Sequence, residues 1–174
     1  MVPLARVQIW WFKPLLKVSA AALFFKMKTD LVVGGFIFHE DKVLLIHHKK
    51  SDKWWEVGGH IDKDETPDDC LLREIKEEVN IDVQILNQAN LTNKGTTKRN
   101  LAAPFYVSVH NVGDHDHCCL FYICKALNPE KLKINKELKN FGWFTKDDMN
   151  KDHIPPDVKD IAAKAFELWE KHNA

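Results

Sequence analysis

Three glutamates stand close together in one segment of the chain, and their spacing predicts a metal site. Glu74, Glu77 and Glu78 are three and four positions apart, so on an α-helix they project from one side. Like charges at these separations repel, so a cation should compensate them. Mg²⁺ prefers oxygen ligands and is usually held by a few carboxylates together with substrate phosphates. The segment therefore predicts a Mg²⁺ site for phosphate chemistry, which Mn²⁺ can also occupy.

The neighbouring residues predict where this helix begins and ends. Thr66 is a favourable N-cap, and Pro67 suits the first helical position, where its missing N–H costs nothing. Asn80 accepts the left-handed conformation that ends many helices. Between these residues runs an apolar stripe of Leu71, Leu72, Ile75 and Val79. The stripe should pin the helix onto a core and leave the carboxylates along one flank.

The same segment resembles the conserved box of the Nudix hydrolase family, the MutT-like nucleotide pyrophosphohydrolases. The matching residues are Gly59, Glu65, Arg73, Glu74, Ile75, Glu77, Glu78 and Ile81. Asn80 departs from the family pattern, which has glycine there, but asparagine accepts positive φ better than most residues. Six fixed identities at this spacing would coincide by chance on the order of once in 10⁶ chains of this length. The motif is therefore specific.

The resemblance implies hydrolysis of a pyrophosphate bond in a nucleoside diphosphate linked to another group. It assigns metal binding to Glu74, Glu77 and Glu78 and to the carbonyl of Gly59. The carboxylate that serves as general base varies among family members, and we assign this role to Glu74. Bound Mg²⁺ neutralises phosphate oxygens, orients the phosphate chain and lowers the pKa of a coordinated water. The implied cofactor is therefore Mg²⁺.

Three further box residues are implied to support this centre. Arg73 resembles the residue that orients the acids with its charged fork, so we place it with the catalytic group. Glu65 resembles its partner in holding the loop against the helix. Gly58 precedes Gly59 at the end of a strand-like segment and belongs to the same supporting structure.

Candidate residues outside the box are less specific. Glu137 stands six positions before Trp143, an arrangement that resembles the acid preceding the last strand in nucleotide-cleaving Nudix members, where that acid reaches the metal. A solvated loop glutamate is the alternative. His115 and His117 would share a strand face and contact phosphate or base. Trp143 would stack on a base, although burial in a core is the commoner fate of tryptophan.

The strand and helix patterns predict an α/β fold. Strand-like segments occupy residues 31–38, 43–48, 54–57, 81–91, 101–112, 117–127 and 139–145. An amphipathic helix follows Pro155 and Pro156 from Asp157 onward. The resemblance implies an α/β/α sandwich with a mixed sheet and the box helix packed against it. Base and sugar contacts are expected from loops, here residues 94–100 and the region of Asp157.

The composition agrees with one small enzyme domain, over residues 27–174. The chain has 174 residues, is 45% hydrophobic and has zero formal net charge, so no basic face for duplex nucleic acid is expected. Its four cysteines lack metal-binding spacing and indicate reduced core thiols of a cytoplasmic protein. The expected partner is a small nucleotide, and the sequence carries no signal for oligomeric state.

The first 26 residues form a separate apolar and basic extension without an acidic residue. Pro14 and the lysines interrupt its apolar run, so a membrane-spanning helix does not fit. Three interpretations remain open: a membrane-surface or organelle-targeting segment, translation that starts at Met27, or an ordered part of the fold. Contact with a membrane is expected only under the first of these.

The favoured function is hydrolysis of a nucleoside triphosphate, including an oxidised one, to a monophosphate and pyrophosphate. Cleavage of ADP-ribose or of a dinucleoside polyphosphate is the nearest alternative. A sensor domain that binds a nucleotide without cleaving it is an alternative of another class, and loss of a box glutamate would mark it. An EF-hand loop is excluded, because Pro67 and Arg73 occupy positions where it needs glycine and glutamate.

Overall fold

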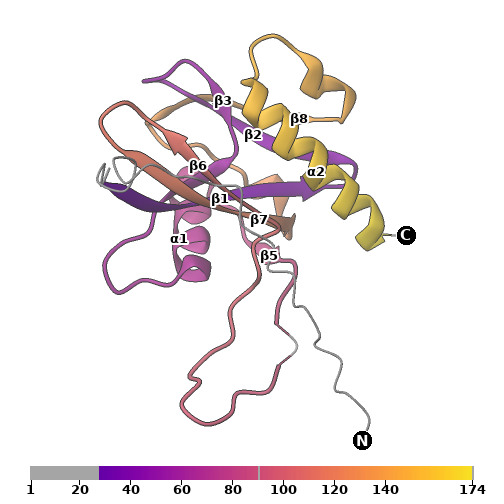
Figure 1. The fold of residues 1–174 in the computed structure, drawn as a ribbon. Coiled ribbons are helices and arrows are strands. Elements are labelled where there is room, and N and C mark those ends of the chain that lie inside the picture. Colours follow the sequence, from indigo (N-terminus) through magenta and orange to yellow (C-terminus); the bar gives the residue numbers. More distant parts are fainter. Residues whose placement is uncertain (1–27, 90, 174) are drawn as a thin grey trace, which may run out of the picture.

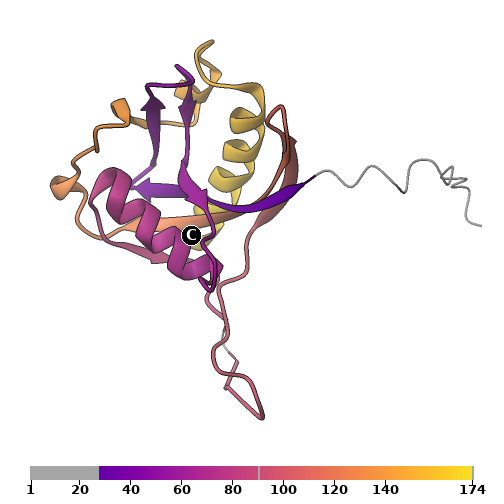
Figure 2. The same cartoon turned by 90° about the vertical axis from the view of Figure 1, so that its left-hand side faces the viewer.

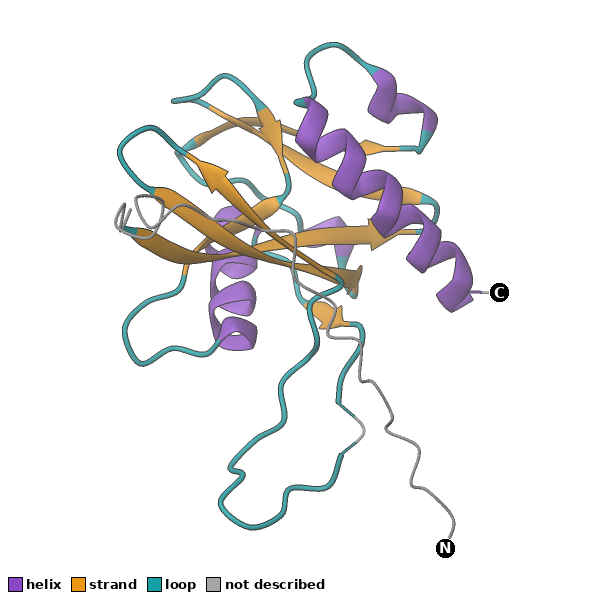
Figure 3. Cartoon of the chain, in the orientation of Figure 1, coloured by secondary structure: helices purple, strands orange, loops and turns teal. Residues whose placement is uncertain are grey.

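A mixed sheet lies between two helices in the computed structural model, which describes residues 28–89 and 91–173. Within these residues the sheet has eight strands (Figure 1, Figure 3). Helix α1, Pro67–Val79, packs on one face, and helix α2, Pro156–Asn173, packs on the other (Figure 2). The predicted α/β/α sandwich, with a mixed sheet and the box helix against it, is confirmed.

Strand β1, Thr29–His39, is the centre of the sheet. One edge pairs in parallel with β7, Asp116–Ala126, along almost its whole length. The other edge is shared by two antiparallel strands: β4, Val57–His60, takes the first half, and β2, Lys42–His48, takes the second. A tight turn with Glu40 at φ 55° joins β1 to β2. β1 therefore pairs directly with β4, the strand that contains the box glycines.

The other strands extend the sheet on both sides. Strand β2 also pairs with β3, Trp54–Trp55, and with β8, Leu138–Phe144. The outer edge of β7 is shared by β5, Val83–Ile85, and β6, Tyr106–Asn111. Two short 3₁₀ helices, η2 (Pro129–Lys131) and η3 (Asp147–Asn150), lie in connections before and after β8.

Alternation along the strands builds one apolar cluster on each face of the sheet. Val33 and Ile37 of β1 enter the α1-side cluster, which includes Leu71 and Ile75 of the box helix. Phe36 and Phe38 point the opposite way into the α2-side cluster with Phe166 and Trp169. Both helices are therefore fixed to the same central strand.

The predicted limits of the box helix are confirmed. The Thr66 side chain accepts a hydrogen bond from the Asp69 backbone N–H and caps the first turn. Asn80 takes the left-handed conformation, at φ 55° and ψ 27°, and its N–H donates to the carbonyl of Ile75. The helix therefore begins and ends where the sequence predicts, with the three box glutamates near its C-terminal end.

Two predicted strands are shorter than expected. Residues 81–91 form only the three-residue strand β5, and a left-handed Asn87, at φ 58°, follows it. Residues 101–112 begin their strand only at Tyr106, because the Ala102 N–H donates to the buried Asp68 carboxylate instead of to a neighbouring strand. Between these strands, the described residues 86–89 and 91–105 form a long loop (Figure 1).

The expectations for the N-terminal extension lie outside the described residues. Within the described part of the chain, no helix is long and apolar enough to cross a membrane.

Candidate active site

The turn from β4 into the box brings backbone and carboxylate into close contact. Gly58 and Gly59 pair with Gly34 and Val33 of β1. A Cβ atom on Gly58 would lie 2.0 Å from the carbonyl oxygen of Val33, and one on Gly59 would lie 2.2 Å from Oε1 of Glu74. Both positions therefore require glycine for close approach.

Arg73 forms the charged centre of the box. Its Nε and Nη2 donate to the two carboxylate oxygens of Glu65 at 2.9 and 2.8 Å, and its Nη1 donates to Oε1 of Glu74 at 2.7 Å. Nη2 also donates to the carbonyl of His60, and Nη1 lies 3.5 Å from Oε2 of Glu77. The hydrogen bonds from Arg73 lower the pKa of Glu65 to about 2. Arg73 thus joins the loop to the helix and compensates two of the three box acids.

Substitution of Arg73 by lysine keeps the positive charge and removes the forked hydrogen bonding of the guanidinium group. We expect Arg73→Lys to lower the melting temperature by several degrees and to reduce kcat about 10- to 100-fold, because an ammonium cannot reproduce the paired geometry. Arg99→Lys is the matched control, since Arg99 makes a similar pair with Asp69 on an exposed surface. Thermal unfolding and steady-state kinetics measure both effects, and equal losses in the two variants would contradict this role.

Glu78 is the buried acid of the site. Its side chain is 6% exposed and its Oε2 accepts the Gly58 N–H at 3.2 Å. Burial raises the pKa of Glu78 to about 8, and the charges of Glu74, Glu137 and Glu56 add to this rise. A buried carboxyl surrounded by other carboxylates favours a cation, so these residues fit a divalent metal.

Glu137 reaches this group from the loop before β8. The Asn135 N–H donates to the carbonyl of Glu78, and the Lys49 N–H donates to the carbonyl of Glu137, which ties the loop to both α1 and β2. The Glu137 side chain is exposed and close enough for its charge to affect Glu78. The structure therefore brings Glu74, Glu78 and Glu137 together, with Glu77 on the more exposed flank at 59% side-chain exposure.

A cavity of about 460 Å³ opens beside the two box glycines. It lies between the end of β4, strands β6 and β7, and the start of α2. Its polar lining includes Glu56, His60, His110, His117 and Asp157. This volume falls in the range of small-molecule binding sites.

Glu56 is a site residue that the sequence reasoning missed. Its Oε1 lies over Gly34, 3.0 Å from where a Cβ would stand, beside the ring of Phe121. Burial raises the pKa of Glu56 to about 7, with the Asp157 charge adding to the effect. The available signal was an acid inside an otherwise apolar stretch, between Trp55 and the glycine turn.

Only some of the residues that were predicted to contact the substrate line the cavity. His117 lies on the cavity wall, and Asp157 does as well. Trp143 instead packs against the α1-side cluster with its ring 5.6 Å from that of His39, so the structure does not bring it to the cavity. The expected base-contact loop, residues 94–100, holds Arg99 against Asp69 at the start of α1, also away from the cavity.

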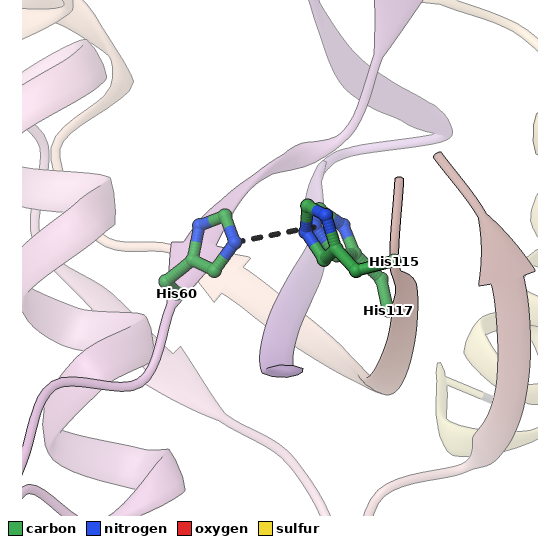
Figure 4. A group of neighbouring side chains, drawn as sticks. All are labelled: His60, His115 and His117. Atoms are coloured by element: carbon green, nitrogen blue, oxygen red, sulfur yellow. Dashed lines mark hydrogen bonds between the residues drawn. The ribbon is translucent and has the colours of Figure 1, made fainter. Parts of the chain in front are cut away.

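Three histidines converge beside the cavity, and their convergence was not predicted. Nε2 of His117 lies 3.2 Å from Nε2 of His60 and 3.0 Å from Nε2 of His115 (Figure 4). His60 ends β4, His117 lies in β7, and His115 lies in the turn just before β7. Burial lowers the pKa of His117, and the neighbouring imidazoles add to the effect.

Known proteins share both the sequence pattern and the fold. The family model described as the NUDIX domain matches residues 28–165, so the chain belongs to the Nudix family. A NUDIX-family hydrolase from Clostridium perfringens is 28% identical, with a TM-score of 0.72 over 80% of this chain and 97% of that one. The box of this chain keeps all of its glutamates and departs from the family pattern only at Asn80.

Other similarities are more distant or more local. A Caenorhabditis elegans Ap4A hydrolase has a TM-score of 0.61 and 16% identity, covering 82% of this chain and 96% of that one, and shows the fold alone. The mRNA-decapping enzyme subunit 2 of Saccharomyces cerevisiae (strain YJM789) is 43% identical over 68 residues. That match covers 37% of this chain and only 7% of the yeast protein's length.

Proposed function

We propose that the chain hydrolyses a nucleoside triphosphate, including an oxidised one, to a monophosphate and pyrophosphate in a Mg²⁺-dependent reaction. The observation that carries the proposal is the position of the cavity relative to the box. The cavity has space for a nucleoside and opens beside Gly59, and the carboxylate of Glu74 on α1 lies against the same glycine. The phosphate chain of a bound nucleotide would run from the cavity toward the acids of α1.

The box residues divide the work among them. Mg²⁺, when bound, neutralises phosphate charge and lowers the pKa of the attacking water. Glu74, Glu77, Glu78, Glu137 and the Gly59 carbonyl supply the oxygens that hold it. Glu74 accepts the proton of the attacking water as general base, and Arg73 holds its carboxylate in place at 2.7 Å.

The cavity lining supports selection of a nucleoside. Glu56 and Asp157 offer carboxyl oxygens, and His110 offers a ring nitrogen, to a base or sugar. With a pKa near 7, Glu56 can donate as well as accept a hydrogen bond at neutral pH.

Product analysis with a panel of nucleotides tests the proposal. We expect Mg²⁺-dependent release of pyrophosphate from one or more nucleoside triphosphates, and loss of this activity by roughly 10²- to 10⁴-fold in Glu74→Gln. The panel should include oxidised triphosphates, ADP-ribose, a dinucleoside polyphosphate and a capped RNA, the last because of the local likeness to the yeast decapping enzyme. Preferred cleavage of one of the last three compounds would replace the proposed substrate class. Thermal stabilisation by a nucleotide without turnover in Mg²⁺ would indicate the sensor function.

A further inference from the structure

The three converging imidazoles of His60, His115 and His117 form a second cluster of potential ligands, here called the imidazole cluster. All three ligand nitrogens lie within 4.8 Å of one another. The rings come from two parts of the chain, and Figure 4 shows the ring of His60 facing those of His115 and His117. The parallel pairing of β1 with β7 and the antiparallel pairing of β1 with β4 bring these parts together.

Hydrogen bonds among the three rings cannot satisfy all of their Nε2 atoms at once. Nε2 of His117 faces both other Nε2 atoms, at 3.0 and 3.2 Å. A neutral ring nitrogen carries either one proton or one lone pair, so it cannot make a separate, full hydrogen bond to each neighbour in one tautomer. A cation at the centre would instead accept a lone pair from all three nitrogens.

The distances match those of a tetrahedral metal site. Zinc binds imidazole nitrogen at about 2.0–2.1 Å, which places neighbouring nitrogens about 3.3 Å apart in a tetrahedron. The two measured separations are close to this value. The ligand nitrogens of the third pair, His60 and His115, lie within 4.8 Å of each other, and the rings that carry them are exposed or half-buried.

Carboxylates around the cluster orient the rings and complete the site. Oδ1 of Asp114 lies 2.6 Å from Nδ1 of His115 and accepts its proton, which leaves the lone pair on Nε2. Asp30 stands opposite His117 in the register of β1 with β7, and its Oδ2 lies 3.5 Å from Nε2 of His115. A metal-binding histidine typically has such a carboxylate partner, and Asp30 can supply the fourth ligand.

We propose that His60, His115 and His117 bind one Zn²⁺ ion. Imidazole nitrogen suits zinc and related transition metals, whereas the oxygen-rich box suits Mg²⁺, so the two sites are chemically separate. The zinc ion would tie the end of β4 to the hairpin of β6 and β7. Since His60 directly follows Gly59, the ion would also hold the box turn in position.

Zinc binding to the full-length protein, without a histidine tag and after chelator treatment, tests this site. We expect one Zn²⁺ per chain by calorimetry, and a rise in melting temperature of roughly 5 °C or more at a hundredfold excess over the dissociation constant. Co²⁺ should give the intense visible absorption of a tetrahedral complex. His115→Ala and His117→Ala should weaken zinc binding at least 100-fold, and Asp114→Asn should weaken it about 10- to 100-fold.

Matched variants distinguish the imidazole cluster from the box. His153→Ala removes an exposed histidine elsewhere and should leave zinc binding unchanged. The double variant Glu77→Gln/Glu78→Gln should lose hydrolysis and keep zinc. Zinc binding that survives His115→Ala, or that disappears with the box acids, overturns the proposal. Circular dichroism checks folding, and His115→Ala decides if His117→Ala does not fold, because His115 lies in a turn.

Discussion

Glu78→Gln is expected to reduce Mg²⁺-dependent hydrolysis by roughly 10²- to 10⁴-fold and to stabilise the metal-free protein at pH 8. The buried carboxyl has a pKa of about 8 in the folded chain, against an ordinary value near 4.5. Between these two pH values the folded protein binds a proton that the unfolded chain has released. Stability from this group is therefore full below pH 4.5 and falls as the pH rises through 8.

Glutamine removes this pH dependence and keeps the local hydrogen bond. It is neutral at every pH, and its carbonyl oxygen can still accept the Gly58 N–H. The gain in unfolding free energy at pH 8 should be on the order of a few kcal/mol and should nearly disappear at pH 5. Denaturant unfolding with a chelator present, at both pH values, measures it.

Glu77→Gln is the control for this prediction. Its side chain is 59% exposed, so this variant should lose activity without gaining stability at pH 8. Added Mg²⁺ should stabilise the wild type and close the gap to Glu78→Gln, because only the complete set of acids binds the ion well. A difference between wild type and Glu78→Gln that stays constant from pH 5 to pH 8 would refute the buried-acid account.

Gly58→Ala and Gly59→Ala should have opposite dominant effects, although the two residues are adjacent. A Cβ on Gly58 meets backbone on the neighbouring strand, at 2.0 Å from the Val33 carbonyl oxygen and 3.0 Å from Cα of Gly34. Backbone at the centre of a sheet cannot move aside cheaply. We expect a loss of roughly 3 kcal/mol or more of unfolding free energy.

A Cβ on Gly59 meets the carboxylate of Glu74, which is a side chain and can rotate away. The protein should therefore stay folded while the general base and metal ligand is displaced, and kcat should fall about 100-fold or more. Urea unfolding and kinetics on the two variants separate the effects. A Gly58→Ala protein of wild-type stability, or a fully active Gly59→Ala protein, would show that the turn is looser than described.

Local sequence signals predicted the catalytic helix well. Its start depends on Thr66 and Pro67 and its end on Asn80, and each of these acts through its own backbone or nearest neighbours. The placement of Arg73 between Glu65 and Glu74 likewise follows from spacing along one helix and the loop before it. Such features need no knowledge of distant strands.

Features that depend on distant contacts could not be predicted in this way. The strand expected over residues 101–112 is delayed because a buried Asp68, far back in the chain, takes the Ala102 N–H. His60 meets His117 only through the common strand β1, and Glu56 becomes a cavity residue only because Gly34 leaves room above that strand. In each case the partner lies far along the chain and is brought near only by the tertiary fold.

The parallel pairing of β1 with β7 also dictates the order in which the enzyme can be assembled during synthesis. Each pair joins residues 87 positions apart, such as Thr29 with Asp116. The box helix ends at Val79, but the surface it covers includes Tyr122, Cys124 and Ala126 of β7. The ribosome must therefore release β7 before the whole surface against which the box helix packs is present. Until then the nascent chain contains the box residues but lacks part of the sheet that supports them. The apolar stripe of the box helix is exposed to chaperones and proteases during this time.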